Sequence, residues 1–248
     1  LREKQLAQKA HMQAFVDRFR AKASKARQAQ SRLKMIEKMD IVDAVMADRV
    51  TQFTFPEPEE EKSPMIVLET ADDGYEKNKP VLENLELRID ADDRIALLGA
   101  NGNGKSTLAR LLAGRLEPMA GEIRRAPRLA CGYFAQHPIE ELDPEATPYD
   151  HMALRMPQAT PEARRARLAR FGFGEDHVFV KVEALSGGEK ARLTFALITH
   201  SAPPLLVLDE PTNHLDIEAR AALVAAINDF AGAVVLVSHD WHLLSLTA

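Results

Sequence analysis

Apolar and polar positions along residues 65–248 fall into two patterns, short apolar runs and stretches with helical spacing. The runs Leu205–Leu208 and Ala231–Val237 have the length of buried strands. The run Arg94–Leu98 is followed by Thr107–Ala113, in which apolar residues recur at helical spacing. Strands and helices in this succession predict an α/β fold with a mixed β-sheet core.

The segments around this core predict two smaller lobes. Strand-like runs at Ile66–Leu68 and Leu85–Ile89 come close together before any long helix, which predicts an antiparallel β-lobe. Residues 140–186 are rich in Ala, Arg, Leu and Glu, and prolines at 144, 148, 157 and 161 mark breaks. We therefore expect a small helical lobe there.

The first 40 residues have a different pattern. Met12, Phe19, Ala26 and Leu33 recur every seven residues without an intervening Pro or Gly, so we predict one long helix that packs on a partner helix. These residues carry 11 Lys and Arg against 4 Asp and Glu, although the whole chain has a net charge of −5. Such a charge run is either a solvated face or an arm that contacts nucleic acid backbone. The basic residues of this arm are Arg18, Arg20, Lys22, Lys25, Arg27, Arg32 and Lys34.

Residues 41–64 end in a run rich in Pro and Glu, Pro56–Pro64, which predicts an exposed, extended linker. The chain is thus expected to have three parts, a basic helical arm at 1–40, a linker at 41–64 and a globular domain at 65–248. Because the first residue is Leu rather than Met, we expect the chain to be a piece of a longer protein.

Composition narrows the class of protein. With 46% hydrophobic residues the chain can form a core, but no apolar run approaches the roughly 18 residues that span a bilayer. Cys131 is the single cysteine, which excludes an internal disulfide and favours a reducing compartment. We expect it to be a small core residue rather than a reactive thiol.

A glycine-rich segment, Gly99–Ser106, stands between the predicted strand and helix of the core. Its spacing, G-x-x-x-x-G-K-S, lets backbone N–H groups curl around phosphate oxygens, and the helix that follows adds the positive end of its dipole. Lys105 is expected to reach the outer phosphates, and the Ser106 hydroxyl to hold Mg²⁺. The alternative is a glycine-rich turn that binds nothing. The strand, the spacing, the Lys and the Ser together favour the phosphate site.

Two carboxylates, Asp209 and Glu210, follow the predicted strand Leu205–Leu208. The carboxyl ends of parallel strands are where such sheets bind ligands. Asp209 is predicted to be a partner of Mg²⁺. Glu210 is predicted to point the other way, because strand side chains alternate, and to polarise an attacking water. Acidic residues are common at strand ends, so this pair alone would be weak evidence for a catalytic site. Its position downstream of the phosphate loop is what supports the prediction.

A second glycine-rich string, Leu185–Glu189, precedes a predicted helix at Lys190–Ile198. Its amides and the helix dipole make a second anion site in a chain that already has one at Gly104.

Taken in order, these strings resemble the ATP-binding cassette of ABC proteins, a P-loop NTPase fold, over residues 65–248. The strings are Gly99–Ser106, Gly132–His137, Leu185–Glu189, Leu208–Thr212, Leu215–Asp216 and Ser238–Asp240. Within ABC proteins, Glu210–Asp216 and Phe19–Ala26 are similar to the ABC-F family, whose members are soluble, duplicated cassettes without membrane domains. The resemblance implies that this chain is the end of an inter-cassette linker plus a second cassette, with the arm reaching toward tRNA and the ribosome.

The resemblance also implies roles for single residues. Tyr75 would stack on adenine, although a buried Tyr in the β-lobe is the alternative. Gln136 would bridge Mg²⁺ and the attacking water, although a Gln after a strand is ordinarily a surface residue. His239 would hydrogen-bond the γ-phosphate and orient Glu210, although a His at a strand end is more often structural. The implied ATP contacts are Tyr75, Gly99, Asn101, Gly102, Asn103, Gly104, Lys105, Ser106, Thr107, Ser186, Gly187 and Gly188, and the implied Mg²⁺ contacts are Ser106, Gln136 and Asp209.

In the family, two cassettes face head to tail, and the string at Leu185–Glu189 caps the γ-phosphate of ATP held by the opposite cassette, in the same protein or in a homodimer. The resemblance therefore implies Mg-ATP binding and hydrolysis by a cytoplasmic protein that acts on ribosomes. The alternatives are the energising subunit of a membrane transporter and a nucleotide-binding fragment without turnover. Two features depart from the family: Trp241 replaces a residue that is commonly basic, and family cassettes continue beyond Ala248.

Overall fold

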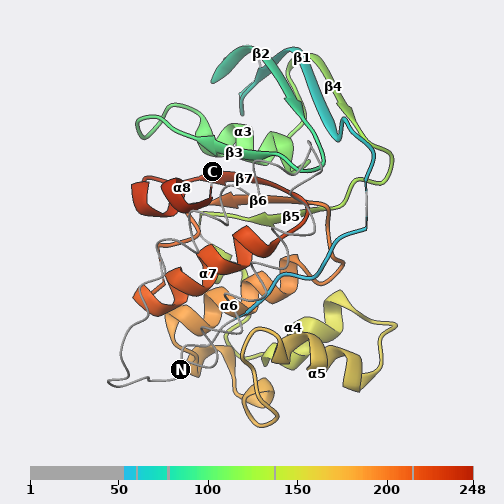
Figure 1. The fold of residues 1–248 in the computed structure, drawn as a ribbon, viewed down its shortest axis with the longest axis vertical. Helices are drawn as coiled ribbons and strands as arrows, with labels where there is room; N and C mark the ends of the chain where they lie inside the picture. Colours follow the sequence, from blue (N-terminus) through green and yellow to red (C-terminus); the bar gives the residue numbers. More distant parts are fainter. Residues whose placement is uncertain (1–52, 60, 77–78, 137, 214, 248) are drawn as a thin grey trace, which may run out of the picture.

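The computed structural model describes residues 53–59, 61–76, 79–136, 138–213 and 215–247, and their helices and strands are arranged in layers (Figure 1). An antiparallel sheet lies at one end, followed by α3, a parallel sheet, α6 with α7, and a helical lobe. The strands are β1 (Ile66–Asp73), β2 (Leu82–Ile89), β3 (Arg94–Leu97), β4 (Ala120–Arg125), β5 (Cys131–Phe134), β6 (Leu205–Asp209) and β7 (Ala233–Val237). The α-helices are α3 (Lys105–Leu112), α4 (Pro148–Arg155), α5 (Pro161–Ala169), α6 (Gly187–Ile198), α7 (Ile217–Asp229) and α8 (Trp241–Thr247). The predicted core with its two lobes is confirmed, whereas the predicted arm at 1–40 lies outside the described residues.

The parallel sheet has the strand order β3-β7-β6-β5. Every residue of β6 and β7 is buried, as expected for parallel strands that are covered on both faces and read as continuous apolar runs. Asp209 pairs with Val237 in the ladder, so the segments that follow β6 and β7 leave the sheet at the same edge. In β5, burial raises the pKa of the Cys131 thiol to about 12, which fits a core residue and not a reactive one.

Alternation along the strands divides the parallel sheet between two cores. Leu205 and Val207 belong to the core that β6 shares with α3 and β1. Leu206 and Leu208 belong to the core that β6 shares with α6 and α7. The helices α3 and α6 therefore cover opposite faces of the sheet, as Figure 1 shows.

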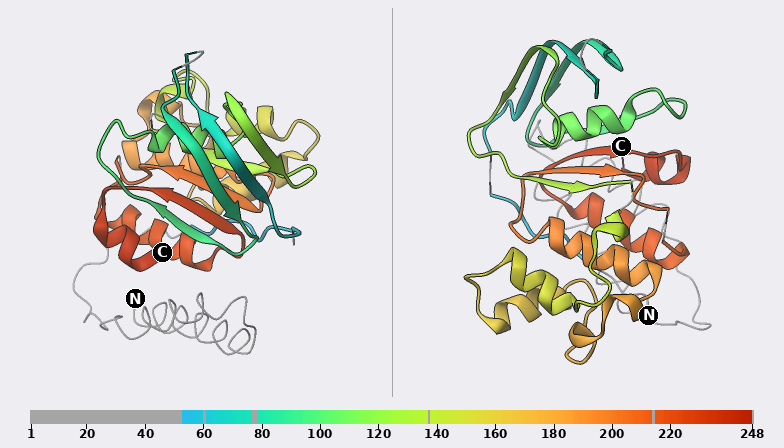
Figure 2. Two further views of the ribbon diagram at one scale, coloured as in Figure 1. Left: turned by 90° about the horizontal axis from the view of Figure 1, so that it is seen from above. Right: turned by 180° about the vertical axis from the view of Figure 1, so that it is seen from behind.

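The antiparallel sheet has the order β2-β1-β4 and forms the predicted β-lobe. Its inner face contributes Ile66 and Leu68 of β1 to the core that contains α3. Seen from above, its strands lie over the parallel sheet (Figure 2). Helix α3 is thus held between two sheets, which positions the loop that precedes it.

The helical lobe lies at the far end of the molecule from the antiparallel sheet (Figure 2). Helices α4 and α5 each begin with a proline, Pro148 and Pro161, and each is capped by the side chain of the threonine before it, Thr147 or Thr160. Two of the prolines that we predicted as breaks are therefore helix starts. They fit there because the first turn of a helix needs no N–H donor at these positions.

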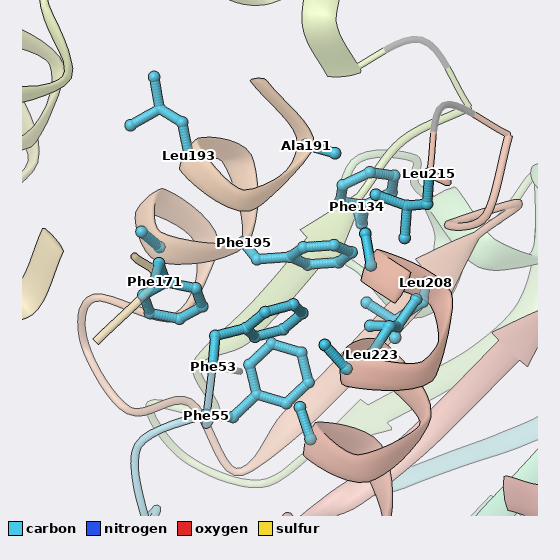
Figure 3. Packing of buried hydrophobic residues seen from close by; sticks show 14 of the residues in the cluster. Phe53, Phe55, Phe134, Phe171, Ala191, Leu193, Phe195, Leu208, Leu215 and Leu223 are labelled. Atoms are coloured by element: carbon cyan, nitrogen blue, oxygen red, sulfur yellow. The ribbon is translucent and has the colours of Figure 1, made fainter. Parts of the chain in front are cut away.

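The prediction of an exposed linker over residues 41–64 is wrong for its described beginning. Phe53 is 3% exposed and Phe55 is 8% exposed, and both pack in the core beside α6 (Figure 3). The exposed Thr54 separates them, which is the alternation of an extended segment with one buried side. The Pro and Glu residues that follow favour exposure, but they do not decide the burial of the two aromatic side chains before them.

Candidate functional site

The loop between β3 and α3 is shaped by glycines in left-handed conformations. Gly102 has φ 83° and Gly104, the N-cap of α3, has φ 79°. A Cβ atom added at Gly104 would lie 2.7 Å from the Leu82 side chain, so this position also has no room for one. At Gly99 and Gly102 an added Cβ would meet nothing within 4 Å. The loop is therefore packed against β2 on one side and open on the other.

The N-terminus of α3 has no side-chain cap and no acidic residue in its first turn. Lys105 bends back over the loop, and its Nζ donates hydrogen bonds to the carbonyls of Gly99 at 2.7 Å and Ala100 at 2.9 Å. An ammonium group, open glycines and an uncapped helix end are together the chemistry of a phosphate site. The predicted phosphate loop thus has a fitting geometry.

Tyr75 lies beside α3, the helix that follows this loop, and is exposed at 56%, so the alternative of a buried tyrosine is wrong. Its hydroxyl oxygen accepts hydrogen bonds from Arg110 Nη1 at 2.8 Å and from Thr107 Oγ1 at 3.2 Å. The Arg110 guanidinium also lies 5.6 Å from the centre of the Tyr75 ring. Sequence reasoning missed Arg110. Its place on α3, three residues after Thr107, is the signal that could have found it.

Asp209 and Glu210 stand where β6 ends. Asp209 is 1% exposed, and its charge adds to burial in raising the pKa of the neighbouring Tyr133. Glu210 has φ 50°, a left-handed conformation that is uncommon outside glycine, and its N–H donates to the Val237 carbonyl at 2.9 Å. Its direction is therefore set by this turn and not by strand alternation, which corrects the reason that we gave above. Strained residues of this kind gather at functional sites.

Glu210 Oε1 lies 3.5 Å from Nε2 of His239, the residue that follows β7 by two positions. The structure thus brings together the predicted base and its predicted partner. Gln136 is exposed and follows β5 by two positions. Because β5 pairs with β6, Gln136 comes off the same edge of the sheet as Asp209.

The second glycine-rich string begins a helix earlier than predicted, since α6 starts at Gly187 rather than at Lys190. Ser186 is its N-cap, and Ser186 and Glu189 bond reciprocally: Ser186 Oγ accepts from the Glu189 N–H at 3.3 Å, and Glu189 Oε2 accepts from the Ser186 N–H at 2.8 Å. His177 Nε2 lies 3.2 Å from Glu189 Oε1. Burial alone would raise the pKa of Glu189, but the hydrogen bonds from Ser186 and the charges of His177 and Arg192 hold it below its usual value.

This string is exposed at Ser186 and Gly187 and starts the helix that covers the sheet on the face away from α3. The sequence placed Ser186, Gly187 and Gly188 at a second half-site and included Glu189 in the string, but neither the capping role of Glu189 nor the contact with His177 was predicted. The S-x-x-E spacing of a capping box could have found Glu189, whereas His177 comes from the helical lobe and leaves no local signal.

A Mg²⁺ ion at this site would have few carboxylate ligands from the described part of the chain. Among the residues that the structure describes, no group of three or more His, Cys, Asp or Glu could hold a metal. Asp209 fits as a buried carboxylate at the end of β6. Ser106, on the first turn of α3, and Gln136 would have to supply further oxygens, with the remainder from phosphate and water.

A family model described as "ABC transporter" matches residues 82–213, and a second model with the same description matches residues 1–55. The chain is 47% identical over 245 residues to the probable ATP-binding protein YheS of Escherichia coli strain K12, covering 99% of this chain and 38% of YheS. It is 46% identical over 243 residues to a probable ATP-binding cassette sub-family F member 3 homolog of Encephalitozoon cuniculi, covering 98% of this chain and 43% of that protein. The chain thus spans less than half the length of these relatives.

Among solved structures, the fold is similar to the ATP-binding cassette MJ0796, a dimer in a post-hydrolysis state bound to ADP and Pi, with a TM-score of 0.62 and 21% identity. The match covers 74% of this chain and 91% of that one. At this identity it shows a shared fold. Within the described part of the chain, no helix has the length and apolar character needed to cross a membrane.

Proposed function

Since the chain belongs to the ATP-binding cassette family, with relatives in its sub-family F, we propose that it binds Mg-ATP and hydrolyses it as one half of a pair of cassettes. The observation that carries the proposal is the open loop before α3, where Lys105 donates to the Gly99 and Ala100 carbonyls. The same ammonium can turn to phosphate oxygens, which are stronger acceptors because they are charged. Tyr75, exposed beside α3, supplies an aromatic face for adenine.

For hydrolysis we propose that Glu210 polarises the attacking water. Its contact with His239 at 3.5 Å supports this role, because a carboxylate held by a second side chain keeps one orientation. Mg²⁺, held by Ser106, Asp209 and Gln136, would neutralise charge that develops on the phosphates. Such positioning and charge stabilisation are the main contributions that proteins make to phosphoryl transfer.

For the pair of cassettes we propose that Ser186, Gly187 and Gly188 contact the ATP that a second cassette holds. The exposure of this string and its place at the start of α6, across the sheet from α3, support contact with a partner and not with the chain's own phosphate loop. Two apolar side chains near the candidate site, Leu98 at 54% and Ile217 at 86% exposure, offer surface that a partner would cover.

The test is ATP-driven self-association of the chain carrying Glu210→Gln, which should bind ATP but not turn it over. Sedimentation velocity should show a shift from monomer to dimer with Mg-ATP and no shift with ADP. The double variant Glu210→Gln/Lys105→Ala should stay monomeric in both. A single species that ignores nucleotide would exclude the paired-cassette mechanism for this chain.

For the longer protein from which such a chain would come, we propose a cytoplasmic role on ribosomes, with residues 1–40 as the contact to RNA. The basic residues of that segment and the sub-family F relatives support it. Neutralising Lys22, Lys25 and Arg27 should weaken RNA association at low salt while ATP binding persists. If ribosomes sediment without the full-length Glu210→Gln protein in the presence of ATP, the ribosomal role is excluded and an energising subunit of a transporter becomes the better reading.

A further inference from the structure

Four phenylalanine rings form a continuous stack through the core below the parallel sheet. Phe171 and Phe53 stack at 5.5 Å between ring centres with planes 25° apart. Phe53 and Phe195 follow at 5.6 Å and 19°, and Phe195 and Phe134 at 4.5 Å and 17°. All three pairs have the near-parallel geometry and the spacing of stacked aromatic rings.

The four rings come from four different parts of the chain. Phe171 follows α5 and belongs to the helical lobe, Phe195 is on α6, and Phe134 ends β5 two residues before Gln136. Phe53 comes from the segment that precedes the first strand, and Figure 3 shows it beside Phe195 on the side where Phe171 lies. The stack therefore joins the helical lobe, the helix of the second glycine-rich string and the strand of the candidate magnesium ligand.

Phe53 is the link on which this connection depends. It stacks on both Phe171 and Phe195, and its 3% exposure leaves it enclosed by the rings. Phe55, its neighbour two residues on, contacts the same two rings and also Phe230, at 6.0 Å with planes 86° apart. The segment that contains Phe53 and Phe55 thus inserts two aromatic side chains into the core.

We propose that Phe53 is a positioning residue that sets the helical lobe against α6 and β5, and so places Ser186 and Gln136 for the reaction. The effect on the reaction, through Ser186 and Gln136, rests on the proposed ATPase function. The effect of Phe53 on the position of the helical lobe does not rest on it. Packed interiors move between discrete arrangements and do not deform continuously, so a ring that fills the contact between two parts decides which arrangement they adopt.

The first experiment measures the position of the lobe in the 248-residue chain. Spin labels at Ala166→Cys on α5 and Ala221→Cys on α7, both exposed positions, in a Cys131→Ser background give one distance distribution. Phe53→Leu keeps an apolar side chain but removes the flat ring, and should broaden or shift the distribution. The matched control Phe230→Leu removes an equally buried ring, 2% exposed, that contacts Phe55 but is not part of the stack, and should leave the distribution unchanged.

The result that overturns the proposal is a folded Phe53→Leu chain whose distance distribution matches the parent. Near-ultraviolet circular dichroism checks that the variant is folded, and Phe53→Met serves in its place if it is not. An equal broadening in Phe230→Leu would also overturn the proposal, because the effect would then belong to core packing in general.

The second experiment separates the two proposals in the full-length protein. Phe53→Leu should lower kcat by about threefold or more while the ATP dissociation constant stays within about twofold, because the ring acts on placement and not on the phosphate contacts. Loss of ATP binding in Phe53→Leu would overturn the positioning role. If instead the parent protein neither binds nor hydrolyses ATP, the proposed function fails while the spin-label result still decides the position of the lobe.

Discussion

The two glycine-rich helix starts of this protein differ in what already occupies them. At α3 the N-cap is Gly104, with no side chain to satisfy the first amides and no acid in the first turn. At α6 the N-cap is Ser186, which bonds to Glu189, and Glu189 adds a negative charge next to the helix end. The first is open to an anion, whereas the second is partly satisfied and partly neutralised by its own chain.

This difference indicates that the helix starts of α3 and α6 contribute differently to anion binding. An anion would bind at α3 through Lys105 and free amides, but at α6 it would meet the Glu189 carboxylate, whose charge His177 and Arg192 partly offset. The α6 end is therefore suited to complete the shell of a phosphate that is held elsewhere. Its place across the parallel sheet from α3 fits that use.

The largest effect is expected from Lys105→Ala. ATP affinity should fall by about a hundredfold, because hydrogen bonds between charged groups contribute about 1.5–3 kcal/mol each. Isothermal titration of the chain with Mg-ATP measures it. Lys79→Ala, which removes an exposed lysine paired with Glu76, is the control and should bind as the parent does. Equal affinity in the two variants would remove the distinction between the helix starts.

A smaller effect is expected from Arg110→Ala, because Arg110 holds the Tyr75 ring beside α3. Loss of one hydrogen bond and a cation–π contact of about 0.5–1 kcal/mol should weaken ATP binding about fivefold. A competition assay with inorganic triphosphate separates contacts to adenine from contacts to the phosphates. Triphosphate should bind the parent and Arg110→Ala equally, because it has no base. Arg115→Ala, an exposed arginine just after α3, should show no change.

Ser186→Ala tests the self-capped helix start. It should destabilise the chain by about 1 kcal/mol, the usual cost of losing an N-cap, as measured by urea unfolding. ATP affinity of the monomeric chain should not change, because the α6 end is not expected to bind phosphate by itself. A loss of ATP affinity without dimerisation would mean that both helix starts serve one nucleotide in the same chain.

The smallest effect concerns pH and Glu189. Its pKa in the folded chain lies below the usual 4.5, so its contribution to stability is fully present above about pH 4.5 and is lost as pH falls through the folded pKa. Glu189→Gln should therefore lower stability by about 0.3–1 kcal/mol at pH 7, and the difference should shrink below pH 4.5. Urea unfolding at pH 7 and pH 3.5 measures it. A difference independent of pH would show that the charge of Glu189 does not matter.

Local patterns predicted most of the elements. The strands β6 and β7 are continuous apolar runs, and α3 follows the glycine-rich loop as the spacing of that loop indicates. These elements could be predicted because hydrophobic periodicity depends on residues that are close in the sequence. The exposed linker failed at Phe53 and Phe55, since two aromatic residues before a Pro-rich run say nothing of the surface that they meet. His177 was missed for the same reason, because it contacts Glu189 from another part of the chain, whereas Arg110 left a local signal in its spacing from Thr107.

The order of the chemical strings, the phosphate loop, the acidic strand end and the second glycine-rich helix start, was determined by the sequence alone, because each depends on spacing within a few residues. Which strings share a site was decided only by the tertiary structure. Strand alternation sends α3 and α6 to opposite faces of the parallel sheet, and the ladder between β6 and β7 brings Glu210 to His239. Packing of distant segments depends on the shape of the whole core. The stack of Phe53 with Phe171 and Phe195 is the clearest example, because its rings come from separate parts of the chain.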